Sequence, residues 1–126
     1  MREADRRRSE RVPLVVDLFY RVERPPEIKI KFGDRVETAY LVDISASGIG
    51  FNCGTELPGN SELDITFNLS APSGDVAKIR AVGVVRYCSF QDDKQIYRIG
   101  LVFTLIDERE EKLIDTFVKN LQKGGA

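Results

Sequence analysis

The feature that most constrains the fold is a series of short segments in which apolar and polar residues alternate between turn residues. In the clearest segment, residues 61–69, every second side chain is apolar: Leu63, Ile65, Phe67 and Leu69. A period of two is typical of a β-strand with one buried face. Turn sequences stand on both sides, at Pro58-Gly59-Asn60 and at Pro72-Ser73-Gly74. The pattern therefore predicts antiparallel strands connected by tight turns.

Five further segments indicate strands, and one more alternates over a shorter length. The five are residues 14–22, 36–45, 49–53, 76–90 and 96–105, with a bulge expected at Gly83. One face of a strand is predicted to carry Val36, Thr38, Tyr40, Val42 and Ile44, as the core side. One face of another is predicted to carry Tyr97, Ile99, Leu101, Phe103 and Leu105. The stretch Pro25–Phe32 alternates at Ile28, Ile30 and Phe32, which is compatible with an extra strand.

The period changes near the end of the chain. Asp107 is a favourable N-cap residue, and Glu110 stands three positions later, as in a capping box. Apolar residues then repeat at helical spacing: Leu113, Ile114, Phe117, Val118 and Leu121. The whole pattern predicts an all-β fold, a six- to seven-stranded antiparallel β-barrel with one C-terminal α-helix as a plug or flank.

Composition narrows the class of protein. The 126 residues suffice for one domain, and a formal net charge of −1 disfavours a general DNA or RNA binder. Histidine is absent and Cys53 and Cys88 form no CxxC motif, so we expect reduced cysteines, no metal site, no cofactor and no enzymatic activity. No apolar run is long enough to span a bilayer, and charges stand where a signal peptide is apolar, which predicts a cytoplasmic protein.

Charge is concentrated at the N-terminus. Residues 1–11 contain five arginines and three acidic residues, a sum of +2, whereas the rest of the chain sums to −3. The segment has no apolar periodicity that could anchor it to a core. We therefore predict a flexible basic arm over residues 1–12 and a barrel domain over residues 13–126.

Two short motifs carry side chains suited to one kind of ligand. The arm contains Arg6, Arg7 and Arg11, and arginine binds phosphates, the O6/N7 edge of guanine and purine faces. The strand ending near Gly48 carries Asp43 and Ser45, which we expect to project together from the barrel exterior. A carboxylate can accept hydrogen bonds from guanine N1 and N2. The combination indicates an anionic guanine nucleotide held between the arm and the strand end.

These motifs resemble the signature of the PilZ domain family, RRxxxR followed by (D/N)xSxxG. Arg6, Arg7 and Arg11 match the first motif, and Asp43, Ser45 and Gly48 match the second. The resemblance implies that cyclic di-GMP is the ligand. It also implies that the arginines hold its phosphates and guanines, and that the (D/N)xSxxG segment surrounds a guanine.

The resemblance extends over essentially the whole chain. The segment Tyr97–Phe103, with Gly100, resembles the family's late strand. Arg98 shares the strand face of Gly100, where relatives often place a side chain that stacks on the ligand. The stretch Pro25–Phe32 is then a family-variable insertion or an extra strand.

As a member of this family the chain would signal to a downstream protein once the ligand orders its arm, and it could form a homodimer through the C-terminal helix. Other interpretations stay open. The barrel could act as an interaction module that binds no ligand, and the arginines could be a solvated tail. Asp43 and Ser45 could serve only a local turn, and Arg98 could be an ordinary surface residue.

Overall fold

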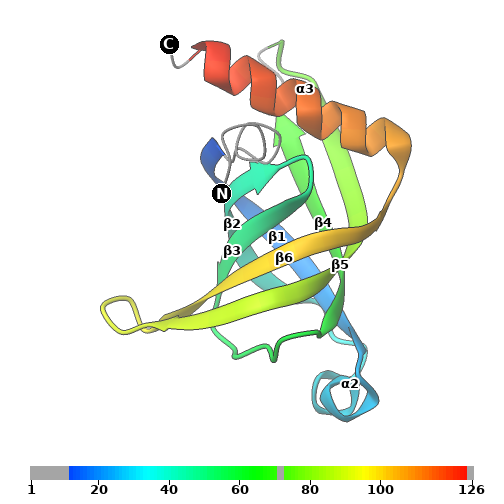
Figure 1. Ribbon diagram of the computed structural model, residues 1–126, viewed down its shortest axis with the longest axis vertical. Coiled ribbons are helices and arrows are strands. Elements are labelled where there is room, and N and C mark those ends of the chain that lie inside the picture. Colours follow the sequence, from blue (N-terminus) through cyan, green and yellow to red (C-terminus); the bar gives the residue numbers. More distant parts are fainter. Residues whose placement is uncertain (1–11, 71–72, 125–126) are drawn as a thin grey trace, which may run out of the picture.

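Six antiparallel strands close into a barrel in the order β1-β2-β3-β6-β5-β4 (Figure 1). The computed structural model describes residues 12–70 and 73–124. The elements found there are β1 (Val12–Arg24), α2 (Pro26–Phe32), β2 (Glu37–Ser45), β3 (Gly48–Cys53), β4 (Glu62–Ser70), β5 (Val76–Gln91), β6 (Ile96–Ile106) and α3 (Glu108–Gly124). The predicted all-β barrel with a C-terminal helix is confirmed.

The core fills the inside of the barrel with alternating side chains. Every apolar side chain predicted to point inward from β4 is buried, namely Leu63, Ile65, Phe67 and Leu69. At the centre, the rings of Tyr20 and Phe51 lie with their centroids 5.8 Å apart. Burial raises the pKa of the Tyr20 hydroxyl far above its usual range, so the ring is a neutral core residue.

One predicted strand face is wrong along most of β2. Ala39 and Leu41 are buried in the core, whereas Tyr40 is 54% exposed and Val36 56% exposed. Thr38 is also exposed and Val42 is half-buried, so both belong to the outer side with Tyr40. The register between β2 and β3 shifts between Leu41 and Asp43, and this bulge returns Ile44 to the core as predicted.

The stretch Pro25–Phe32 contains no extra strand. Residues Pro26–Phe32 form the helix α2, which packs against β1 at the end of the barrel away from α3 (Figure 1). Pro25 is extended and Pro26 occupies the start of the helix, where its missing N–H costs nothing. Ile28 and Phe32 face the core four positions apart, while Ile30 is 80% exposed. The apparent alternation was therefore a helical i, i+4 pair.

Helix α3 lies across the other end of the barrel and contacts β1, β2 and β5 (Figure 1). Ile114 and Val118 are buried, and Phe117 packs against the same core. The predicted stripe is thus narrower than expected, since Leu113 and Leu121 are about two-fifths exposed, at 40% and 39%. The helix closes the barrel end with its middle and leaves its outer flank uncovered.

The start of α3 confirms one predicted contact and corrects another. The Asp107 carboxylate accepts a hydrogen bond from the backbone N–H of Arg109 at 2.8 Å, as an N-cap residue does. Glu110 instead accepts a hydrogen bond from the backbone N–H of Arg80 at 2.7 Å, so it ties the helix to β5.

Leu105 is 69% exposed, contrary to the predicted face of β6. The register of β5 with β6 shifts between Val82 and Gly83, which confirms the bulge expected at Gly83.

Candidate ligand-binding face

The start of β1 lies beside the strand end that carries the second motif. Val12 pairs with Ile44, and Pro13 pairs with Asp43. Val12 directly follows Arg11 in the sequence. Arg6, Arg7 and Arg11 lie outside the described residues. The two motifs, more than thirty residues apart in sequence, are therefore joined through the first pairs of β1 with β2.

A row of four residues runs across the outer face of the barrel from β2 to β5. The pairing of neighbouring strands places Asp43 opposite Gly50, Gly50 opposite Gly100, and Gly100 opposite Tyr87. A Cβ atom at Gly50 would lie 2.7 Å from one carboxylate oxygen of Asp43, so the carboxylate lies over this glycine. A Cβ atom at Gly100 would overlap the ring of Tyr87. The carboxylate and the aromatic ring therefore fill the space above the two glycines.

Ser45 does not project from the barrel exterior as predicted, because its side chain is fully buried. Its hydroxyl lies 3.1 Å from the Ser47 hydroxyl and 3.4 Å from the Gly48 carbonyl oxygen, which accepts a hydrogen bond from it. It also accepts a hydrogen bond from the backbone N–H of Ser47 at 3.2 Å. These are the contacts of a local serine turn. Ser45 shapes the link between β2 and β3.

Gly48 is required by the packing of the same link. A Cβ atom at this position would overlap the carbonyl oxygen of Leu101 in the neighbouring strand β6. The backbone of β3 can begin its pairing with β6 only when residue 48 has no side chain, and Gly48 pairs there with Val102. The glycine of the motif therefore permits the close approach of two strands.

Arg98 lies next to this row, in a groove of about 580 Å³ over β2, β3 and β6. Its Nε donates a hydrogen bond to the side-chain oxygen of Asn52 at 2.7 Å, and the two residues face each other across the strand pair. Tyr40, which pairs with Asn52, lines the same groove. A planar guanidinium is thus held in place beside an exposed aromatic ring.

The face therefore combines a carboxylate and an aromatic ring, which lie over two paired glycines, with a fixed guanidinium and a second aromatic ring. Of the residues predicted for the site, Asp43, Arg98 and Gly100 share this face, while Ser45 and Gly48 lie behind it in the turn. Sequence reasoning missed Gly50, Asn52 and Tyr87, since only the cross-strand register brings them to the site. Guanidinium and aromatic groups can stack on a purine, and the carboxylate can accept hydrogen bonds from its ring and exocyclic N–H groups.

Comparison with known proteins identifies the family. The fold is a small closed β-barrel with a helix across one end, and the sequence matches the family described as PilZ domain over residues 5–120. The chain belongs to the PilZ domain family. No protein among the curated sequences gives a significant match.

Solved structures share the fold at low sequence identity. The inhibitor of motility MotI/DgrA from Bacillus subtilis is 17% identical with a TM-score of 0.73, over 90% of this chain and 50% of that one. The PilZ domain of Escherichia coli YcgR, solved with c-di-GMP, is 15% identical with a TM-score of 0.61, over 95% and 94%. The MrkH–c-di-GMP complex of K. pneumonia is 17% identical with a TM-score of 0.64, over 95% and 53%. The chain thus spans about half the length of the MotI/DgrA and MrkH chains.

Neither a metal-binding cluster nor a membrane-spanning helix is found in residues 12–70 and 73–124. Among them, no group of three or more histidine, cysteine, aspartate or glutamate side chains is arranged to hold a metal ion. Within the same residues, no helix has the length and apolar character that crossing a membrane requires. Cys53 is buried and Cys88 half-buried, and both are free thiols, as expected from the sequence.

Proposed function

We propose that the chain is a cyclic di-GMP receptor that binds its ligand on the outer face of β2, β3 and β6. One observation carries the proposal: β1 begins by pairing with the strand end of the second motif, Val12 with Ile44 and Pro13 with Asp43. The RRxxxR motif ends one residue before Val12. The two halves of the family signature can therefore close around a single ligand.

The chemistry of the residues suggests a role for each part. Arg6, Arg7 and Arg11 would hold the phosphates and the guanine edges, because arginine forms paired hydrogen bonds with both. Asp43 would accept hydrogen bonds from guanine N1 and N2. Gly50 and Gly100, which carry no side chain, leave room for the Asp43 carboxylate and the Tyr87 ring, and both groups would contact the base.

The remaining predicted residues would act at the edge of the ligand or behind it. Arg98 is held by Asn52 next to the glycines, where its plane could stack on a base. Ser45 and Gly48 would act indirectly, by fixing the turn that places Asp43. The role of Ser45 is thus structural, unlike the exterior contact expected from the sequence.

The signalling step follows from where the ligand would sit. We propose that binding orders residues 1–11, the part of the predicted arm that precedes β1, against the barrel and that a downstream protein recognises this ordered state. The choice of ligand is supported by two structures with the same fold, YcgR and MrkH, which were solved with c-di-GMP. Among the described residues of the binding face, no nucleophile is paired with a base, and this favours a receptor over an enzyme.

Isothermal titration calorimetry with cyclic di-GMP tests the proposal, with GTP and cyclic GMP as comparison ligands. We expect cyclic di-GMP to bind at high affinity, and we expect no binding of GTP or cyclic GMP. Arg7→Ala or Arg11→Ala removes a charge-assisted contact, which costs about 1.5–3 kcal/mol, or roughly 10- to 150-fold in affinity. Arg8→Ala removes the same charge from the arm outside the signature positions and should have a much smaller effect. Equal losses in all three variants would indicate bulk attraction by the arm.

A further inference from the structure

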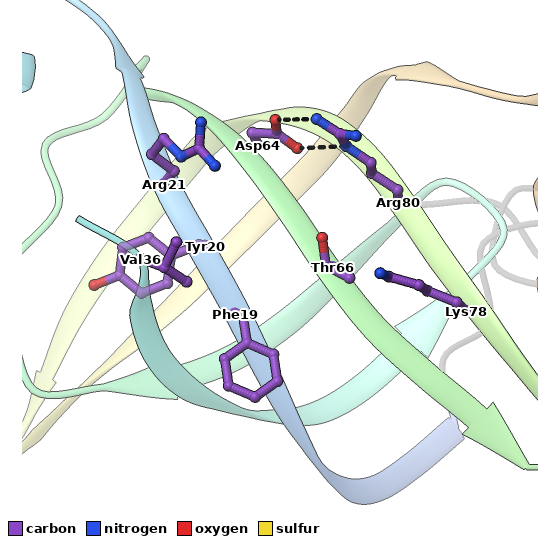
Figure 2. Close-up of a pocket in the computed structure, with 8 residues that line it drawn as sticks. All are labelled: Phe19, Tyr20, Arg21, Val36, Asp64, Thr66, Lys78 and Arg80. Carbon is purple, nitrogen blue, oxygen red and sulfur yellow. Dashed lines mark hydrogen bonds and ion pairs between the residues drawn. The ribbon is translucent and has the colours of Figure 1, made fainter. Parts of the chain in front are cut away.

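A second groove lies on the opposite side of the barrel from the candidate ligand face. It crosses the outer surface of β1, β4 and β5, and it encloses about 220 Å³ (Figure 2). These three strands are consecutive in the barrel order, as are β2, β3 and β6, so the two faces point away from each other. The groove is lined by Phe19, Tyr20, Arg21, Val36, Asp64, Thr66, Lys78 and Arg80.

The groove is cationic, in contrast to the whole chain. Arg21, Lys78 and Arg80 contribute three positive charges and Asp64 one negative charge, a local sum of +2, whereas the chain carries −1. Arg80 holds the Asp64 carboxylate with hydrogen bonds of 3.1 and 3.5 Å. Within residues 12–70 and 73–124, neither Arg21 nor Lys78 forms an ion pair. In this part of the chain, Arg21 and Lys78 are therefore available to an anionic partner.

The uncommitted cationic groups point into the groove. Figure 2 shows the ammonium group of Lys78 directed toward Thr66 and the guanidinium of Arg21 directed toward Asp64. The Arg21 Nε is buried and has no hydrogen-bond partner among the described residues, so the stem of this side chain is packed in place. The Asp34 carboxylate is bound by Lys29 at 3.0 Å, which lowers its pKa, and Arg21 adds only a smaller electrostatic effect.

The apolar part of the groove lies beside these charges. Phe19 is 40% exposed on β1, and Val36, just before β2, is 56% exposed. Arginine and aromatic side chains are enriched where proteins bind one another, because they combine apolar contact with directed hydrogen bonds. A partner for this surface therefore needs apolar groups as well as negative charge.

The floor of the groove disfavours an isolated phosphate. It consists of strands paired on both sides of β4, whose backbone N–H groups are used in the ladders with β1 and β5. Phosphate sites commonly draw on free backbone N–H groups at loops or helix ends. The Asp64 carboxylate also lies between the cations, where it repels a multiply charged anion. A single carboxylate near Arg21 or Lys78, attached to a chain with apolar side chains, carries less charge and is therefore repelled less.

We propose that this groove binds an acidic, extended segment of a partner protein, with a carboxylate on Lys78 and Arg21 and an apolar side chain on Phe19 and Val36. The inference goes beyond nucleotide binding, because it assigns an output surface to the side of the barrel that the proposed ligand does not cover. It does not depend on the identity of that ligand.

The test is a selection of short random peptides displayed on phage against the full chain, run in parallel with and without cyclic di-GMP. We expect enrichment of peptides that combine aspartate or glutamate with leucine, phenylalanine or similar residues. A synthetic peptide of the enriched sequence should lose about tenfold in affinity for Lys78→Glu, because an attractive contact becomes repulsive. Phe19→Ser or Val36→Ser, both at exposed positions, should weaken binding as well.

Controls separate this groove from general attraction. Lys119→Glu makes the same charge change on α3, where Lys119 forms only an exposed pair with Asp115, and it should bind the peptide as the unmodified chain does. The proposal is overturned if no acidic sequences are enriched, or if Lys78→Glu leaves their affinity unchanged. The proposal is also overturned if an oligoglutamate peptide binds as well as the enriched peptide and its binding does not change with Phe19→Ser. Displacement of the enriched peptide by inorganic pyrophosphate at equal concentration would overturn it as well. Binding in the absence of cyclic di-GMP keeps these outcomes separate from a failure of nucleotide binding.

Discussion

Gly48 and Gly100 both occupy places where a methyl group has no room, but the obstacles differ. At Gly48 the obstacle is the backbone carbonyl of Leu101, which pairing holds in place. At Gly100 it is the ring of Tyr87, a side chain that is 51% exposed and can rotate away. The same substitution therefore meets a rigid neighbour in one case and a movable one in the other.

We expect Gly48→Ala to lower the free energy of unfolding by about 1–3 kcal/mol, since strands β3 and β6 must separate to admit the methyl group. Gly100→Ala should cost less than about 1 kcal/mol, because only the Tyr87 ring has to move and the unfolded chain loses entropy. Urea denaturation followed by circular dichroism measures both values. Equal costs would mean that Tyr87 is held as firmly as the backbone.

Asp43 offers a second prediction for a single residue. Its carboxylate lies over Gly50, on the face where the proposed guanine would bind. Asp43→Ala should reduce affinity for cyclic di-GMP and also reduce discrimination against cyclic di-AMP, because adenine lacks the N1–H and N2–H donors that the carboxylate would accept. Calorimetric titration with both nucleotides gives the ratio. An unchanged ratio with reduced affinity would assign Asp43 to positioning the backbone instead of reading the base.

Among the elements, α3 depends on a few contacts at its first turn. Asp107 caps the helix through the Arg109 N–H, and Glu110 in the same first turn accepts a hydrogen bond from the Arg80 N–H of β5. Helix ends leave backbone N–H groups that need such partners. The cap therefore contributes to holding the helix across the barrel end, where Ile114 and Val118 are buried.

Asp107→Ala should lower the free energy of unfolding by about 1 kcal/mol, the usual effect of removing an N-cap carboxylate. Asp115→Ala, which removes only an exposed ion pair with Lys119, should cost about 0.3–0.5 kcal/mol and serves as the control. Thermal melts of the two variants provide the comparison. If the control destabilised the chain as much as the cap variant, the Asp107 contact would not be a stabilising cap.

The sequence predicted elements best where local pattern and tertiary environment agree. In β4 the alternation from Leu63 to Leu69 is the burial pattern observed. In β2 the pattern was misleading, because a bulge between Leu41 and Asp43 changes which side faces inward, and a bulge depends on the partner strand. In α2 a seven-residue segment was too short to distinguish a strand alternation from the helical pair Ile28 and Phe32.

The candidate site was predictable where the position of a residue along its strand decides which face it occupies. Asp43, Arg98 and Gly100 lie on one face, as their positions along the strands suggested. Ser45 was misplaced, since an exposed-looking strand position became buried once its hydroxyl was used by the turn. Gly50 and Tyr87 could not be found without the cross-strand register, which no short window of sequence contains.

For the whole molecule, the proposed ligand should affect the arm and leave the barrel interior unchanged. We expect cyclic di-GMP to reduce amide exchange and raise order parameters in residues 1–11, and to shift the resonances of Asp43 to Gly50. The strand Leu63–Leu69 should change little, because its packing lies within the core. An NMR titration measures all three regions. If the dynamics of the arm did not change at saturating cyclic di-GMP, the barrel would be better explained as an interaction module that does not use the arm.

The closed order of the strands has one further consequence, for how this protein can meet other chains. Around the described barrel, β1 pairs with β4 and so completes the ladder that would otherwise end at two borders. A sheet with such borders has edge strands with unpaired backbone groups, which can accept an additional strand from a neighbouring chain. Repeated addition of strands leads to fibres. The wall has no such border around its circumference, and only strand ends such as residues 87–91 of β5, which pair with β6 alone, extend past their neighbours. We therefore expect partners to recognise side chains on the outside of the wall, because these short strand ends leave little backbone for growth into a continuous sheet.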